Sequence, residues 1–220
     1  MSSSHPAPQS FVAVFVGATR GIGLATLKAL TRALPNPRFY VIGRSKARFA
    51  GELALLNEYN PNAAIQFVEA EVSLIKGIDG VCERIMNLEK HVDLLFMSPG
   101  SLAFGGPHYT EEKLDLCFAL SFYIRMRLIE RLLPMLMQAP HPRVLSVLAG
   151  GHEGPLFTND GDIGLRKKAC YGSCSGFYRV LSDGSTATDG KVLGPMEREG
   201  WPLKVFEHTQ EVFGEILSQK

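Results

Sequence analysis

The sequence predicts an α/β fold with a doubly wound parallel sheet, and three observations lead to this prediction. Short apolar segments alternate with segments of helical character from residue 11 to residue 148. The first of these segments, 11–16, is apolar throughout, which is typical of a strand buried on both faces of a parallel sheet. A glycine-rich stretch, 17–23, follows the first of them. Strands that alternate with helices form βαβ units, and these units build such a sheet.

Five strands are expected, each short and each bounded by residues that favour turns. The first, Phe-Val-Ala-Val-Phe-Val, consists of β-branched, aromatic and small apolar residues and runs directly into glycine. The fourth is closed by the turn-forming triplet Ser-Pro-Gly at 98–100. The expected strands span 11–16, 38–42, 65–70, 92–97 and 143–148.

Four helices are expected between these strands. The Pro-Asn-Pro turn at 35–37 ends the first, because proline cannot continue a helix. Ser45 is expected to cap the second helix and Ser73 to open the third. Thr110 is expected to cap the fourth, since two glutamates follow it where the helix dipole favours acids. The expected helices span 24–34, 45 to about 60, 73–90 and 110–138.

The pattern weakens after residue 150. The segment 149–175 is rich in glycine and polar residues and shows no helical or strand period. A terminal amphipathic helix is predicted at 201–217, with a docking face for the sheet. That face carries Val205, Phe206, Val212, Phe213 and Ile216.

Composition and charge limit the classes of function. The chain has 220 residues, of which 45% are hydrophobic and 20% charged, and a formal net charge of +1. This balance provides no electrostatic basis for binding nucleic acid or an anionic membrane. No apolar run is long enough to span a bilayer, and the first residues lack the pattern of a signal peptide. We therefore expect a cytoplasmic protein whose four cysteines are free thiols, with no metal site.

The glycine-rich stretch predicts a phosphate-binding turn. Gly17, Gly21 and Gly23 lie between an expected strand and an expected helix. Glycines there allow a tight turn, and the helix N-terminus presents N–H groups to a pyrophosphate. The alternative is a tight strand-to-helix turn that binds no ligand.

The residues after the second strand favour NADP(H) over NAD(H). An Asp or Glu at this point would bind the ribose 2′-hydroxyl of NAD, whereas an Arg accommodates the 2′-phosphate of NADP. The chain has Arg44 and Ser45 there and no acid, and Arg20 lies in the glycine-rich stretch. The alternative is that both arginines are ordinary solvated surface residues.

These segments resemble the short-chain dehydrogenase/reductase family. Gly-Ala-Thr-Arg-Gly-Ile-Gly at 17–23 is similar to the family's Thr-Gly-x-x-x-Gly-Ile-Gly loop, apart from the place of the Thr. Ser-Pro-Gly at 98–100 replaces its Asn-Asn-Ala-Gly, and Glu71-Val72 stands at its adenine-contacting pair. Leu-Ala-Gly-Gly at 148–151 and the Ser-Pro-Gly triplet resemble a subset from fungal secondary metabolism. The resemblance implies a Rossmann-like sheet and these cofactor contacts: Gly17, Thr19, Arg20, Gly21, Ile22, Gly23, Arg44, Ser45, Glu71, Val72, Ser98, Pro99 and Gly100.

The same resemblance implies a catalytic Ser at the end of strand five and a Tyr-x-x-x-Lys on the next helix. Ser146 matches the Ser, although a buried strand hydroxyl bonded to the backbone is the alternative. Tyr171 follows strand five, but Ser175 occupies the place of the Lys. Tyr171 is therefore the expected general acid/base by position alone. Two look-alikes, Tyr109-x-x-x-Lys113 and Tyr123-x-x-x-Arg127, precede strand five and are interpreted as chance matches.

The segment after 176 resembles the extreme C-terminal tail of the fungal subset, which suggests an internal deletion after strand five. The expected fold is thus a single Rossmann-like domain over 11–220, truncated after strand five and followed by the C-terminal helix. Its dinucleotide-binding core is 11–150, its shortened C-terminal part is 151–220, and residues 1–10 are expected to be disordered.

The resemblance implies NADP(H)-dependent hydride transfer to or from a ketone or secondary alcohol of a small lipophilic polyketide or terpenoid. The alternatives are a catalytically inactive nucleotide-binding remnant and a non-redox isomerase or cyclase.

A helix that is apolar on all sides is buried on two sides. The 110–138 helix has this character, and it is the expected interface of a homodimer.

Overall fold

The computed structural model describes residues 10–101, 108–148, 179–180, 186–187, 198 and 200–219. The chain divides into two compact units. Unit 1 comprises Met1–Val72, Gly77–Pro99 and Ile124–Val147, and unit 2 comprises Ser73–Lys76, Gly100–Tyr123 and Leu148–Lys220. The disorder expected for residues 1–10 and the irregular segment expected at 149–175 concern residues almost wholly outside the described part.

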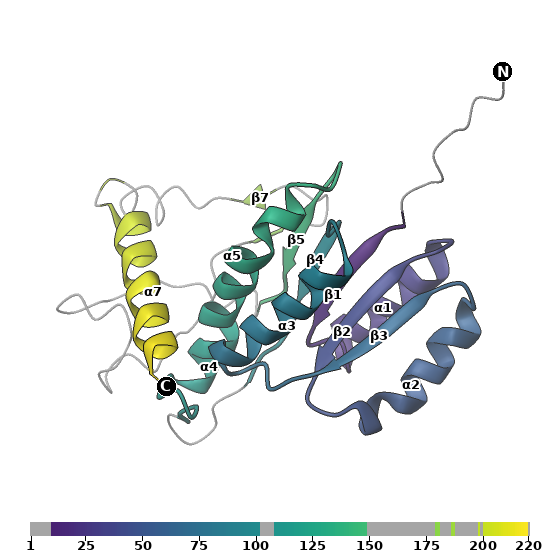
Figure 1. Ribbon diagram of the computed structural model, residues 1–220, viewed down its shortest axis with the longest axis horizontal. Helices are drawn as coiled ribbons and strands as arrows, with labels where there is room; N and C mark the ends of the chain where they lie inside the picture. The colour runs from purple at the N-terminus through teal and green to yellow at the C-terminus, as the bar shows by residue number, and fades with distance from the viewer. Residues whose placement is uncertain are drawn as a thin grey trace. The chain divides into compact units, whose positions relative to one another are not determined.

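Unit 1 contains the predicted five-stranded sheet (Figure 1). The strands are β1 (Val12–Val16), β2 (Arg38–Gly43), β3 (Ala64–Glu69), β4 (Leu94–Met97) and β5 (Arg143–Ser146). Their order is β3-β2-β1-β4-β5, and every neighbouring pair is parallel. The order reverses direction at β1, so β1 and β4 diverge at a topological switch point. The doubly wound parallel sheet is confirmed.

The helices of unit 1 follow the predicted alternation. They are α1 (Gly21–Ala33), α2 (Lys46–Tyr59), α3 (Ile75–Leu88), whose first two residues belong to unit 2, and α5 (Ile124–Leu136). The predicted cap of α2 is confirmed, because the Ser45 hydroxyl accepts a hydrogen bond from the Arg48 N–H at 3.3 Å. Figure 1 shows α3 in front of the sheet and α1 behind it.

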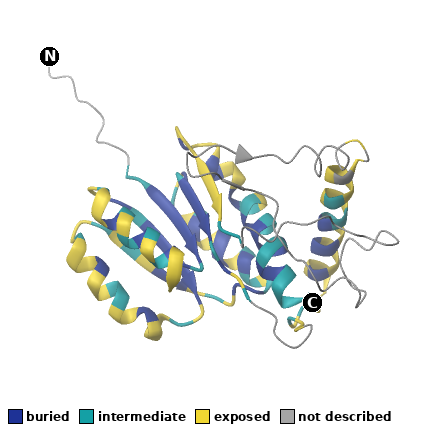
Figure 2. Ribbon diagram, turned by 180° about the vertical axis from the view of Figure 1, so that it is seen from behind, coloured by how far each residue is buried: buried dark blue, intermediate teal, exposed yellow. Residues whose placement is uncertain are grey.

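One face of the sheet packs against α1 and α2 through an aromatic cluster. Phe15 lies at its centre, with its ring centroid 5.3 Å from that of Phe39 and 5.5 Å from that of Phe96. Phe49 of α2 stacks near Phe67 of β3 at 5.2 Å. Full burial of one such side chain stabilises the fold by about 2 kcal/mol. β1 is buried along its length and β2 from Phe39 onward (Figure 2), as both faces of a doubly wound sheet require.

The edge strand β5 differs from the other strands of the sheet. All four of its residues are exposed, and Val144 and Leu145 have 45% and 44% of their surface accessible. Strands of a parallel sheet are normally covered on both faces. The part of unit 1 that the structure describes therefore leaves β5 as an open edge beside a closed core.

The start of the fourth predicted helix was placed wrongly. Thr110 does not cap a helix: its N–H donates to the Leu114 carbonyl, and Lys113 adopts a left-handed φ of 61°. Asp115 is the cap instead, since its carboxylate accepts from the Phe118 N–H at 2.9 Å. The chain then forms α4 (Leu116–Phe118), a π-helical turn over Ala119–Tyr123 and α5.

Glu112, which was expected in the first turn of the fourth helix, caps another helix instead. The Glu112 carboxylate accepts hydrogen bonds from the N–H groups of Ile75 and Lys76, at 2.7 and 3.0 Å. It thereby caps the beginning of α3 from a distant part of the chain.

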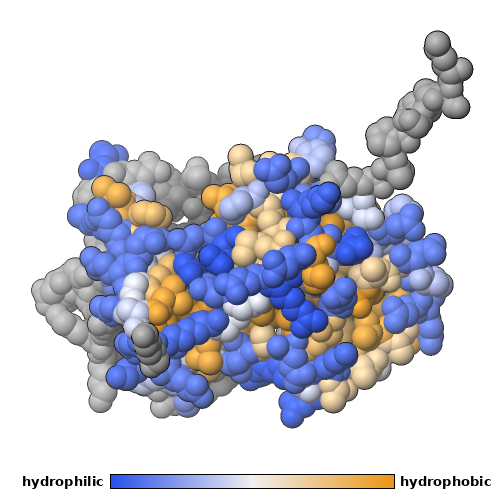
Figure 3. All heavy atoms as spheres, in the orientation of Figure 1, coloured by the Kyte–Doolittle hydropathy of each residue, from blue (hydrophilic) through white to orange (hydrophobic). Residues whose placement is uncertain are grey.

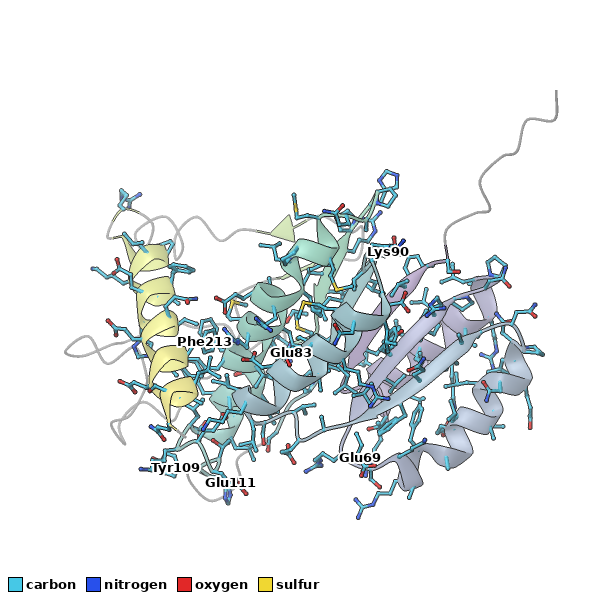
Figure 4. All side chains as sticks on the ribbon, viewed as in Figure 1. Glu69, Glu83, Lys90, Tyr109, Glu111 and Phe213 are labelled. Carbon is cyan, nitrogen blue, oxygen red and sulfur yellow. The ribbon has the colours of Figure 1, made fainter. Side chains whose placement is uncertain are left out.

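Tyr109 and Glu111 are exposed (Figure 4). The Tyr109-x-x-x-Lys113 look-alike thus lies in a turn and not on a helix.

Unit 2 contains the predicted terminal helix, α7 (Trp201–Ser218), and a two-stranded antiparallel pair, β6 (Arg179–Val180) and β7 (Thr186–Ala187). Val212, Phe213 and Ile216 are buried as predicted, whereas Phe206 is 60% exposed and does not belong to the buried face. The Tyr123 hydroxyl and the His208 Nε2 are 3.0 Å apart.

On the face shown in Figure 3, apolar residues form patches between hydrophilic ones.

The aromatic residues of α4 and of the π-helical turn pack on one another. Phe118 stacks on Phe122 with a 5.5 Å centroid distance, and Tyr123 lies edge-on to both. The homodimer expected through 110–138 stays a prediction. In the part of the chain that the structure describes, no helix is long and apolar enough to cross a bilayer.

We expect Glu112→Ala to lower the free energy of unfolding by about 1 kcal/mol, because it removes an acceptor from two helix N–H groups. Urea denaturation followed by circular dichroism measures the change. Glu111→Ala is the matched control, since Glu111 is an exposed acid of the same turn. Equal losses in the two variants would contradict the capping role.

Candidate functional site

The glycine-rich turn and the end of β4 are in direct contact. The Ser98 N–H donates to the Val16 carbonyl at 2.8 Å, and the Ser98 hydroxyl donates to the Gly17 carbonyl at 3.1 Å. Gly17 has a φ of +82°, and a Cβ there would lie 2.5 Å from the Pro99 nitrogen. The Ser98-Pro99 segment therefore closes directly on the turn and excludes any side chain from position 17.

The first turn of α1 has uncapped N–H groups. Arg20 is the N-cap residue and its side chain makes no capping hydrogen bond. The first backbone bond of the helix runs from the Leu24 N–H to the Arg20 carbonyl at 3.2 Å, so helix geometry leaves the preceding N–H groups without a helical partner. A Cβ on Gly21 would meet no atom within 4 Å, so this position faces open space. The turn can accommodate an anion at the positive end of the helix.

Gly23 is required for a different reason. A Cβ at this position would lie 2.6 Å from the Ser98 hydroxyl oxygen and 2.7 Å from the Cα of Ala18. Only glycine lets α1 approach β4 and the turn this closely. Gly17 and Gly23 are thus each required by a different steric contact.

The end of β2 lies beside the same turn. A Cβ on Gly43 would be 3.1 Å from the Thr19 methyl group, so the two segments are in close proximity. Arg44 and Arg20 are both exposed, and the Ser45 hydroxyl is occupied in capping α2. Both arginines are available to a ligand phosphate, while the predicted ligand role of Ser45 competes with its cap. Ile22 is 64% exposed, Glu71 is exposed and Val72 is buried.

Ser146 ends β5, next to Met97 of β4 in the register of the sheet. Arg125 of α5 donates from Nη1 to the Ser146 hydroxyl at 2.5 Å and to the Met97 carbonyl at 3.2 Å. Its Nη2 donates to the Pro99 carbonyl at 2.6 Å. The Ser146 hydroxyl oxygen thus accepts from a guanidinium, and its catalytic role stays a prediction.

Arg125 was missed by the sequence reasoning. Only 2% of its surface is exposed, and burial lowers its pKa to about 10, so it remains a cation at neutral pH. The available signal was a charged residue on the apolar face of a helix, one turn before Leu128 and two before Leu132. Such a residue needs buried partners, and the carbonyl ends of β4 provide them.

Tyr171 lies outside the described residues, as do Cys170 and Cys174, so the structure gives no position for the predicted acid/base. Tyr123 is 2% exposed and its hydroxyl lies 3.0 Å from the His208 Nε2, so it is a buried residue of unit 2. Among the described His, Cys, Asp and Glu side chains, no group of three or more could hold a metal ion. Gly100 is described and exposed, directly after Pro99.

Comparisons with known proteins agree with the class defined by the fold. The chain is 42% identical over 154 residues to an oxidoreductase of Emericella nidulans, covering 70% of this chain and 46% of that protein. It is 43% identical over 161 residues to an NmrA-like family domain-containing oxidoreductase of an Aspergillus species, with 72% and 48% covered. A short-chain dehydrogenase/reductase of Stachybotrys chartarum is 30% identical over 175 residues, with 73% and 49% covered. The chain thus spans about half the length of the curated relatives it matches.

Solved structures show the same fold. A metagenomic short-chain oxidoreductase in complex with NADP superposes with a TM-score of 0.57 at 19% identity, covering 66% of this chain and 64% of that one. An alcohol dehydrogenase of Comamonas testosteroni, specific for bulky-bulky ketones, gives a TM-score of 0.53 at 18% identity, with 61% and 53% covered. No family model matches the chain. The chain has a Rossmann-like α/β fold, and its resemblance to the short-chain dehydrogenases/reductases and to fungal oxidoreductases is confirmed.

We expect Gly17→Ala to destabilise the protein by about 2 kcal/mol or more, because a left-handed φ and a backbone clash with Pro99 add together. Gly21→Ala is the matched control: its φ of +55° is strained, but its Cβ would meet no neighbour. This variant should lose only about 1 kcal/mol. Urea denaturation compares the two, and a larger loss at Gly21 would contradict the packing of Ser98 and Pro99 on the turn.

Proposed function

We propose that the chain binds NADP(H) through the glycine-rich turn and carries it for a short-chain dehydrogenase/reductase reaction. The observation that supports this proposal best is the uncapped first turn of α1, which faces open space at Gly21. By contrast, the N-terminus of α2 is closed by the Ser45 hydroxyl. A pyrophosphate fits the first and has no place at the second.

The choice of NADP(H) rests on charge at the end of β2. Arg44 is exposed where an acid would select NAD(H), and Arg20 is exposed on the turn that approaches Gly43. A guanidinium forms bidentate hydrogen bonds with phosphate oxygens. Solved structures with this fold include a short-chain oxidoreductase in complex with NADP. Bound NADPH would supply a hydride equivalent to a carbonyl carbon.

On the protein side, Ser146 would donate a hydrogen bond to the oxygen of a substrate ketone or secondary alcohol. Tyr171 would supply or accept the proton at that oxygen. The proposed substrates are small lipophilic metabolites of the polyketide or terpenoid kind, because the chain resembles fungal oxidoreductases. A homodimer through the 110–138 segment and a cytoplasmic location complete the proposal.

The alternative is a nucleotide-binding remnant without catalysis, or a non-redox isomerase or cyclase. The observation in its favour is Ser175, which stands where the family has the Lys partner of the tyrosine. An internal deletion after β5 would explain this, and a longer transcript with Tyr-x-x-x-Lys between Gly151 and Gly176 would identify it. Finding no such sequence at the genomic locus would leave gene decay as the explanation.

We expect the purified chain to bind NADPH more tightly than NADH, and Arg44→Ala to weaken NADPH binding about tenfold with little effect on NADH. Titration calorimetry measures both affinities. Arg84→Ala is the matched control, since Arg84 is an exposed arginine on α3. Equal weakening by the two variants, or no binding of either cofactor, would refute the assignment.

We expect NADPH oxidation with a panel of lipophilic ketones to fall about 100-fold or more in Tyr171→Phe and in Ser146→Ala. Absorbance at the reduced nicotinamide band follows the reaction. Turnover that survives Tyr171→Phe would show that another group is the acid. Tight NADPH binding without turnover would favour the inactive remnant.

A further inference from the structure

The hydrogen bonds of Arg125 form an arrangement that neither the resemblance to the family nor the similarity to the relatives predicts. Its guanidinium reaches the Met97 and Pro99 carbonyls of one chain segment and the Ser146 hydroxyl of another. All four residues belong to unit 1. The same cation therefore holds the segment that closes on the glycine-rich turn and the hydroxyl at the end of β5.

The chemistry of the guanidinium fixes the direction of the hydrogen bond to Ser146. Arginine has only N–H donors, so the Ser146 oxygen must accept. The hydroxyl hydrogen does not take part in this bond and can be donated elsewhere. A charge-assisted bond to the oxygen also stabilises negative charge on it and makes the hydroxyl a stronger donor.

We propose that Arg125 is a positioning residue that orients the Ser146 hydroxyl and strengthens it as a hydrogen-bond donor to the substrate oxygen. The inference deepens the proposed function and rests on it for the identity of the substrate. The competing explanation is a purely structural tie between the ends of β4 and β5. The two differ in one respect: only the positioning role requires the positive charge to act on the side-chain atom at position 146.

Other cations of the same helix serve as a reference. Arg127 is two residues further on and pairs with Asp79 at 2.7 Å and with Glu130 at 2.8 Å. Arg131 lies near Asp79 and Glu83. These arginines face the acids of α3 and of α5 itself, whereas Arg125 faces the carbonyl ends of the sheet. Arg127 is thus the matched control for a charge on α5 that does not act on Ser146.

The test replaces the hydroxyl by a thiol that reports the local charge. In the full chain carrying Ser146→Cys, the pH dependence of iodoacetamide alkylation gives the pKa of the introduced thiol. Mass spectrometry of the peptide that contains position 146 distinguishes it from the native cysteines. The buried Cys82, whose pKa is raised to about 12 by desolvation, is an internal reference that reacts slowly.

A cation beside the thiol stabilises the thiolate, so its removal raises the pKa. We expect the alkylation midpoint to rise by roughly one pH unit or more when Arg125→Met is added. Arg125→Lys should retain much of the lower midpoint because it keeps the charge, and Arg127→Met should leave it unchanged. The same midpoint with and without the Arg125 charge would overturn the proposal.

Folding and cofactor binding are measured separately. If Arg125→Met does not fold, Arg125→Gln removes the charge and keeps hydrogen-bonding capacity. Failure of both to fold while Arg127→Met folds would assign Arg125 a structural role and overturn the proposal. Alkylation is carried out without NADPH, so a chain that fails to bind NADPH refutes the proposed function and leaves the result for Arg125 intact.

Discussion

The buried Arg125 guanidinium is the interaction on which the ligand-facing end of unit 1 depends. The Met97 carbonyl at the end of β4 and the Pro99 carbonyl just beyond it both accept hydrogen bonds from this one cation. Desolvation opposes the charge, as the lowered pKa of Arg125 shows, so these hydrogen bonds must compensate for it. Because the same cation also bonds Ser146, the conformation after β4 and the hydroxyl on β5 are fixed together.

A second constraint is steric. Pro99 and the Ser98 hydroxyl occupy the space that side chains at positions 17 and 23 would need. The turn after β1 can therefore come this close to β4 only because it lacks Cβ atoms there. Arg125 holds the Pro99 carbonyl from the other side, so the glycine-rich turn, the Ser-Pro segment and α5 form one continuous set of contacts.

The sheet and the glycine positions could be predicted because their causes are local. Strand composition, the Ser45 cap and the switch from strand to helix at 17–23 are each encoded within a few residues. The capping at Glu112 could not be predicted, since its partners at 75 and 76 are far away in the sequence. The place of Arg125 on the apolar face of its helix was a sequence signal, but its hydrogen-bond acceptors at 97, 99 and 146 lie on other segments and could not be identified from the sequence.

Contacts that build the candidate cofactor site lie within unit 1, from the glycine-rich turn through Gly43 to Arg125 and Ser146. The core of unit 1 is closed by the aromatic cluster around Phe15, whereas the edge strand β5 leaves Val144 and Leu145 exposed. The proposed binding of a dinucleotide would thus use residues that the sheet itself positions. In the proposed reaction, proton transfer would need a group from beyond β5, where the sequence departs from the family pattern. The two capabilities therefore depend on different parts of the chain, and one can be present without the other.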